Sequence, residues 1–82
     1  MTVTVYSTPR CPQCNATKRQ LDRMGVAYRE IDVSSDPEAL AMLHAAGYRQ
    51  APVVVADGQA WTGYRPDLLR ELGARVPAEA TA

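Results

Sequence analysis

The stretch that decides the fold is residues 3–14, VTVYSTPRCPQC. Two valines alternate with threonine and lead into Tyr6, which is typical of a half-buried β-strand at the start of the chain. Turn-forming residues follow, and then two cysteines stand three positions apart, at Cys11 and Cys14. A Cys-x-x-Cys pair directly after a strand, within a βαβ pattern, favours a redox motif over a structural use of the sulfurs.

A helix is predicted from Pro12 to Met24, because residues suited to an inward face recur there at three- and four-residue intervals: Cys14, Thr17, Leu21 and Met24. Gly25 follows in the place of a helix-ending glycine. A proline is tolerated in the first helical turn, where a missing N–H costs nothing. This places Cys11 at the N-cap.

The position of the two cysteines predicts their chemistry. A helix N-terminus stabilises a thiolate through its unpaired N–H groups and the positive end of its dipole, and Arg10 adds a neighbouring cation. Cys14, one turn further in, is expected to face the sheet and to be more buried. We therefore expect Cys11 to attack a disulfide on a partner protein and Cys14 to resolve the mixed disulfide, which leaves a Cys11–Cys14 disulfide for a reductase to reopen.

Five further elements complete a predicted order βαβαββα. Residues 53–55 are three valines, apolar on both faces, and predict a central strand. Asp57-Gly58 is a hairpin signal that returns residues 59–62 antiparallel beside it. The other elements are a strand at 26–33, a helix at 37–46 whose N-cap is a serine or aspartate among 34–36, and a helix from Pro66 that turns Leu68, Leu69 and Leu72 inward.

The composition limits the classes of protein to which the chain belongs. Its 82 residues suffice for one domain, expected over residues 1–74, with a flexible tail over 75–82. Nine basic residues balance nine acidic ones, which argues against a nucleic-acid or membrane-surface binder. The longest apolar stretch is far shorter than a membrane span needs, and the first residues do not resemble a secretory signal. We expect a cytoplasmic monomer.

Other uses of the cysteines stay open at this point. A structural zinc site wants four ligands, and beyond the two cysteines only His44 and scattered carboxylates remain. Two inert buried cysteines are a further alternative. A small copper chaperone is a third, although such domains run βαββαβ and usually have a methionine before the first cysteine, where this chain has Thr8-Pro9-Arg10.

A family resemblance rests on three segments taken together. The Cys-x-x-Cys helix start and Ala51-Pro52 ahead of the valine strand resemble the thioredoxin superfamily in its minimal, glutaredoxin-sized form. Residues 61–67, WTGYRPD, are similar to the Trp-Ser-Gly-Phe-Arg-Pro-Asp signature of the NrdH-type redoxins, which are glutaredoxin-like proteins that behave as thioredoxins. The likeness covers nearly the whole chain. Departures are Pro12, where many of these redoxins have valine or methionine, together with Thr62 and Tyr64.

The resemblance implies a fold, a site and partners. The fold would be an α/β four-stranded mixed sheet flanked by three helices. Pro52 would be a cis-proline, and the segment Gln50, Ala51 and Pro52 would bind an extended partner segment through the backbone of Ala51. Partners would dock on Pro12, Gln13, Trp61, Thr62, Gly63, Tyr64 and Arg65. From residue pattern alone, a trans proline that merely starts a strand is an equal alternative for Pro52, and core packing is an alternative for Trp61 and Tyr64.

The implied activity is that of a protein-disulfide oxidoreductase with no bound cofactor. Its electron donor would be an NADPH-dependent thioredoxin reductase, so NADPH would act indirectly, and its acceptor would be the catalytic disulfide of a class Ib ribonucleotide reductase. A glutathione-dependent glutaredoxin is the alternative within the same class. Glutaredoxins hold the amino end of glutathione with a Gly-Gly pair and acidic residues, whereas this chain has Tyr64 and Arg65 there, so we predict weak glutathione binding.

Overall fold

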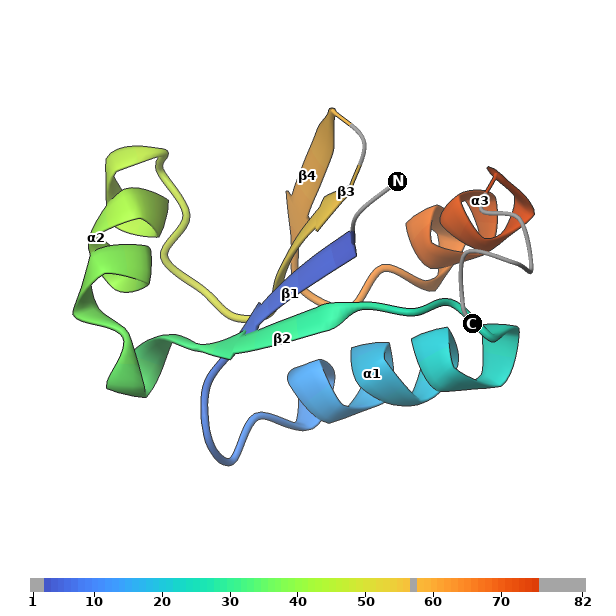
Figure 1. The fold of residues 1–82 in the computed structure, drawn as a ribbon, viewed down its shortest axis with the longest axis horizontal. Helices are drawn as coiled ribbons and strands as arrows, with labels where there is room; N and C mark the ends of the chain where they lie inside the picture. Colours follow the sequence, from blue (N-terminus) through green and yellow to red (C-terminus); the bar gives the residue numbers. More distant parts are fainter. Residues whose placement is uncertain (1–2, 57, 76–82) are drawn as a thin grey trace.

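The computed structural model describes residues 3–56 and 58–75 (Figure 1). The order of strands and long helices along the chain is βαβαββα, as predicted, with one additional 3₁₀ turn, η1, after the second strand. The elements are β1 (Val3–Ser7), α1 (Pro12–Met24), β2 (Arg29–Asp32), η1 (Val33–Ser35), α2 (Pro37–Ala45), β3 (Val53–Ala56), β4 (Gln59–Thr62) and α3 (Pro66–Arg75).

The four strands form one mixed sheet in the order β2-β1-β3-β4. β1 pairs with β2 in parallel, whereas β1 with β3 and β3 with β4 are antiparallel. A parallel pair needs a crossover, and α1 supplies it between β1 and β2. The cysteine pair therefore lies where the chain leaves the C-terminal end of an interior strand and enters a helix.

Helices α1 and α3 bury one face of the sheet. Leu21 of α1 and Leu69 and Leu72 of α3 are fully buried. They pack in one cluster with the sheet residues Val3, Val5, Val54, Ala56 and Trp61 and with Val26. Burial of these side chains is the main favourable term that holds α1, and with it the cysteines, against the sheet.

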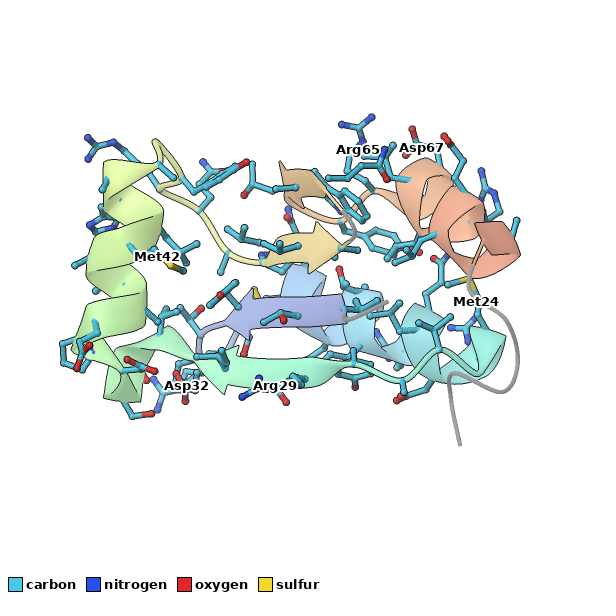
Figure 2. All side chains as sticks on the ribbon, turned by 45° about the horizontal axis from the view of Figure 1, so that its top comes forward. Met24, Arg29, Asp32, Met42, Arg65 and Asp67 are labelled. Atoms are coloured by element: carbon cyan, nitrogen blue, oxygen red, sulfur yellow. A yellow bond between two sulfur atoms is a disulfide. The ribbon has the colours of Figure 1, made fainter. Side chains whose placement is uncertain are left out.

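Helix α2 covers the opposite face at one end only, as Figure 2 shows. Its Leu43 packs with Val33 and Val53, and these three residues form a second, smaller cluster. Val55, one row further along the strand, is 37% exposed. The prediction of a central strand is confirmed, because β3 lies between β1 and β4. Its two faces are covered unequally, because the short helix α2 does not reach over Val55.

Three element boundaries differ from the predictions. β2 is shorter at both ends than the predicted strand over residues 26–33. At its start, the N–H of Val26 donates to the carbonyl of Leu21 at 3.0 Å and so belongs to the end of α1. At its end, the Asp32 carboxylate accepts the N–H of Ser34 at 2.9 Å, which starts η1. α2 ends one residue early, at Ala45. α3 continues to Arg75, so the tail expected from residue 75 begins no earlier than residue 76, and residues 76–82 lie outside the described part of the chain.

Candidate active site

Cys11 caps α1, as predicted. Its backbone is extended, with φ −113° and ψ 101°, and its Sγ accepts the backbone N–H of Cys14 at 3.1 Å. Its carbonyl accepts the N–H of Asn15 at 3.1 Å, which is the first helical bond. The sulfur thus occupies the place that a serine or aspartate oxygen takes at an ordinary N-cap.

The two cysteines form a disulfide, and they differ in access to solvent. Cys14 is 1% exposed, whereas Cys11 is only partly buried. The first turn of α1 holds no acidic residue, so nothing there opposes the positive end of the helix dipole. The outer sulfur, Cys11, therefore lies at the positive end of the helix dipole, and the inner sulfur is shielded from solvent.

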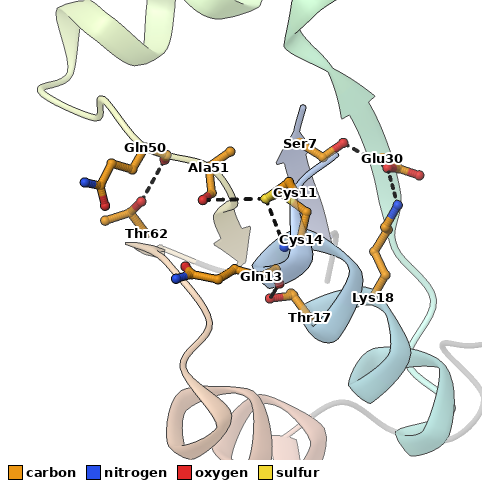
Figure 3. Close-up of a disulfide and its surroundings, with 10 residues drawn as sticks. All are labelled: Ser7, Cys11, Gln13, Cys14, Thr17, Lys18, Glu30, Gln50, Ala51 and Thr62. Carbon is orange, nitrogen blue, oxygen red and sulfur yellow. Dashed lines mark hydrogen bonds and ion pairs between the residues drawn. A yellow bond between two sulfur atoms is a disulfide. The ribbon is translucent and has the colours of Figure 1, made fainter. Parts of the chain in front are cut away.

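The loop before β3 closes one side of the site (Figure 3). The Ala51–Pro52 bond is cis, as the family resemblance implied, and the carbonyl oxygen of Ala51 lies 3.9 Å from Cys11 Sγ. Two hydrogen bonds fix this loop to the end of β4: Thr62 Oγ1 donates to the carbonyl of Gln50 at 2.8 Å, and the N–H of Gly63 donates to the carbonyl of Pro52 at 2.8 Å.

An open groove of about 460 Å³ runs beside the reactive sulfur. Its lining combines both predicted segments, Cys11, Pro12 and Gln13 on one side and Gln50 and Ala51 on the other, and adds Thr8 and Arg10, which the sequence did not mark as groove residues. Gly63 borders the same region, because a Cβ built on it would lie 3.5 Å from Oε1 of Gln13. Ala51 lines this groove and is only partly buried, so a partner can reach it.

The segment 61–65 divides between core and surface. Trp61 is 7% exposed and packs with α3, so the alternative of core packing holds for its side chain. Its indole N–H has no hydrogen-bond partner among the described residues. Tyr64 is 37% exposed and donates its hydroxyl to Oε1 of Gln20 on α1 at 2.6 Å. Arg65 is exposed and pairs with Asp67 at 3.1 Å, and this hydrogen bond holds the pKa of Asp67 below its usual value.

A polar cluster lies on the side of the disulfide away from Ala51, as Figure 3 shows. Ser7 is 3% exposed and donates its hydroxyl to Oε2 of Glu30 at 2.8 Å, and Lys18 Nζ lies 2.7 Å from the same oxygen. The hydrogen bond from Lys18, and next that from Ser7, holds the pKa of Glu30 below its ordinary value. Sequence reasoning missed this cluster, because only the parallel register of β1 and β2 brings Ser7 beside Glu30.

The described residues contain no group of three or more histidine, cysteine, aspartate or glutamate side chains that could hold a metal ion. His44, the one histidine, is exposed on α2. Within residues 3–56 and 58–75, no helix has both the length and the apolar character that crossing a membrane requires.

Comparison with known proteins gives consistent matches. Residues 3–61 match the family model described as Glutaredoxin. The glutaredoxin-like protein NrdH of Escherichia coli K12 is 43% identical over 72 residues, which cover 88% of this chain and 89% of that protein. NrdH of Lactococcus lactis subsp. cremoris MG1363 is 39% identical over 85% of this chain and 97% of its own length. The solved structure of the Escherichia coli NrdH-redoxin, described as having a thioredoxin-like activity profile, superposes with TM-score 0.86 at 43% identity over 88% of this chain and 95% of that one.

Proposed function

Because this chain belongs to the glutaredoxin family, and within it to the NrdH-type redoxins, we propose that it carries electrons from an NADPH-dependent thioredoxin reductase to the catalytic disulfide of a class Ib ribonucleotide reductase. Family membership itself makes the chain a thiol–disulfide redox protein that uses the Cys11–Cys14 pair. The two named partners, and the cytoplasm as the place where a dithiol carrier stays reducible, belong to the proposal.

The reaction we propose transfers two electrons in two exchange steps. The Cys11 thiolate attacks one sulfur of the client disulfide, that S–S bond breaks, and the departing client sulfur takes up a proton. Cys14 then loses its proton and attacks Cys11 Sγ, which forms the Cys11–Cys14 disulfide and releases the second client sulfur as a thiol. The client is reduced and the carrier is oxidised.

The difference in burial between the cysteines is the observation that carries this assignment. Cys11 borders the open groove, whereas Cys14 is 1% exposed and donates its N–H to Cys11 Sγ at 3.1 Å. A client sulfur that enters the groove meets Cys11 first. Cys14 already lies next to the sulfur that it must attack, so the second step needs no large rearrangement of α1.

The groove also supports binding of an extended client segment. Ala51 is only partly buried, and its backbone borders the groove beside Cys11. The bonds from Thr62 and Gly63 hold this backbone in place before a client arrives. Pairing of a client strand with preorganised backbone would position its disulfide over Cys11 independently of most client side chains.

The segment after β4 supports thioredoxin reductase as the donor in place of glutathione. Tyr64 is held over α1 by Gln20 and exposes 37% of its surface, and the exposed Arg65 is a cation. An aromatic ring and a guanidinium at this position do not favour the ammonium group of glutathione. Both features agree with a protein donor that contacts a broad surface.

A coupled assay tests the donor. The oxidised chain is incubated either with NADPH and thioredoxin reductase or with NADPH, glutathione and glutathione reductase, and NADPH oxidation is followed. We expect turnover with thioredoxin reductase and little with glutathione. Turnover in the glutathione system alone would reject the proposed donor and leave the alternative of a glutathione-dependent glutaredoxin.

A pair of cysteine variants tests the acceptor and the order of attack. Cys11→Ser is expected to abolish disulfide reduction. Cys14→Ser is expected to accumulate a mixed disulfide with the class Ib ribonucleotide reductase, visible as a band that reducing agent removes. Complete loss of activity in both variants without any trapped adduct would contradict the assigned order.

A further inference from the structure

Two arginines without partners stand beside the redox groove. Arg10 and Arg49 are both exposed, and among the described residues neither forms an ion pair or a side-chain hydrogen bond. Arg65 and Lys18 differ from them in this respect, because Arg65 pairs with Asp67 and Lys18 pairs with Glu30. The charge of Arg10 and Arg49 is thus available to a binding partner.

The two arginines line two neighbouring hollows that share the loop before β3. Arg10 lines the groove that contains Cys11. Arg49 lines a smaller pocket of about 60 Å³ next to it. Thr8, Gln50 and Ala51 line both, so the two hollows adjoin at the loop before β3. Neither lining contains an acidic residue, so this face is locally basic although the whole chain has a formal net charge of zero.

The backbone of Arg10 gives an independent reason to assign its side chain a role. Arg10 has φ 57°, in the left-handed region, and it is the one non-glycine residue with a positive φ among the described residues. Glycine or asparagine adopts this conformation with less strain than a long side chain does. An L-residue held in this conformation beside a reactive sulfur points to a function for that side chain.

We propose that this groove selects client segments in which acidic residues flank the reactive disulfide. The inference rests on the proposed function, because it names the chemistry of the client that Cys11 reduces. A client strand that pairs with Ala51 lies against both hollows, so carboxylates that flank its cysteines come within reach of Arg10 and Arg49. Complementary charge of this kind raises the rate of encounter and sets the register of the strand, and salt weakens both effects.

The test uses the fully reduced chain and two synthetic peptides with the same internal disulfide. One peptide carries aspartate and glutamate on both flanks, and the other carries lysine at the same positions. Hydroxyethyl disulfide serves as a small uncharged reference. Second-order rate constants are measured by quenched alkylation of the new thiols. We expect the acidic peptide to react about tenfold faster at low ionic strength, and the ratio to fall towards one at high salt.

A double variant isolates the contribution of the two cations. Arg10→Asn with Arg49→Gln is expected to bring the ratio of acidic to basic rates close to one, and asparagine tolerates the left-handed backbone at position 10. Removal of Arg10 also changes the reactivity of the Cys11 thiolate, but this factor multiplies both rates and cancels in the ratio. Arg23→Gln, in the last turn of α1 and away from the groove, is the matched control and should keep the wild-type ratio.

The outcomes of this experiment distinguish a failure of the inference about acidic clients from a failure of the proposed function. A wild-type ratio near one, or a ratio that the double variant retains, overturns the inference. If Arg23→Gln also abolishes the preference for the acidic peptide, the preference comes from the overall charge of the chain. That result overturns the inference as well. If hydroxyethyl disulfide is reduced while the peptides show no preference, only this inference fails. If the reduced chain reduces none of the three disulfides, the proposed function itself fails.

Discussion

Replacement of Gly63 by alanine tests how the redox loop is held. Gly63 has φ 85°, and its N–H donates to the carbonyl of Pro52 at 2.8 Å. An added Cβ would lie 3.5 Å from Oε1 of Gln13, which is an ordinary contact distance, so space does not oppose the methyl group. The cost therefore comes from the backbone conformation alone, about 1–2 kcal/mol for an L-residue in the left-handed region.

This cost has a measurable consequence and a matched control. At about 4–8 °C per kcal/mol for a domain of this size, Gly63→Ala should lower the Tm of the oxidised chain by roughly 4–16 °C. Gly47, after α2, has φ 93° and no atom within 4 Å of an added Cβ. Gly47→Ala should therefore cost about the same, and Gly63→Asn less than Gly63→Ala. Thermal unfolding followed by circular dichroism compares the three variants.

The disulfide-reducing activity of the variants distinguishes the role of Gly63 from that of Gly47. Gly63→Ala should slow reduction of a peptide disulfide, because the strained residue holds Pro52 and borders Gln13, whereas Gly47→Ala should not. An unchanged Tm for Gly63→Ala would refute the backbone argument. A cost more than about 1 kcal/mol above that of Gly47→Ala would show that contact with Gln13, and not the backbone, determines the effect.

Three further substitutions test other parts of the structure. Hydrogen bonds hold the pKa of Glu30 below its ordinary 4.5, so its carboxylate stabilises the fold above about that pH and loses this effect as pH falls through the lowered value. In urea unfolding, Glu30→Gln should cost about 0.5 kcal/mol near neutral pH and progressively less as the pH falls below 4.5, and a cost that does not change with pH would contradict the pair with Lys18. Trp61→Phe should cost only about 1 kcal/mol, because the smaller ring leaves a small cavity but also removes a buried N–H that has no partner in the described structure. A cost more than about 1 kcal/mol above this would contradict the absence of a partner for the N–H. A Cβ on Gly73 would lie 2.9 Å from Sδ of Met24, so the clash offsets the higher helix propensity of alanine and Gly73→Ala should be nearly neutral by itself. In a Met24→Ala background, which lacks the clash, Gly73→Ala should stabilise the fold by about 0.8–1 kcal/mol, the difference in helix propensity. The same small effect in both backgrounds would rule out the clash.

The parts of the fold that the sequence predicted well are those with local chemical signals. α1 spans Pro12–Met24 as expected, since a proline in its first turn and a glycine after its last turn mark its ends. The hairpin between β3 and β4 follows from a turn signal in the same way. The cysteine roles depended on one helical turn of spacing, and the burial of Cys14 agrees with them.

The features that sequence reasoning missed depend on contacts between segments far apart in the chain. Val55 is exposed because α2 lies over only one end of the sheet. The pattern of residues within the valine strand cannot predict where a helix from another part of the chain will pack. Arg49 gains a place beside the redox groove only when the loop before β3 folds next to Thr8. Likewise, the partner of the Tyr64 hydroxyl is Gln20, which lies 44 positions away on α1.

The one-sided exposure of the disulfide has a kinetic consequence. Cys14 is enclosed, the cluster of Ser7, Glu30 and Lys18 occupies the far side, and Cys11 borders the open groove beside Ala51. Under the proposed function, we expect the protein that supplies electrons and the protein that receives them to occupy this opening in turn, without a ternary complex. We therefore expect a ping-pong shuttle that is released between two encounters, whose flux scales with the concentration of free carrier and not with the stability of any assembled complex of enzymes.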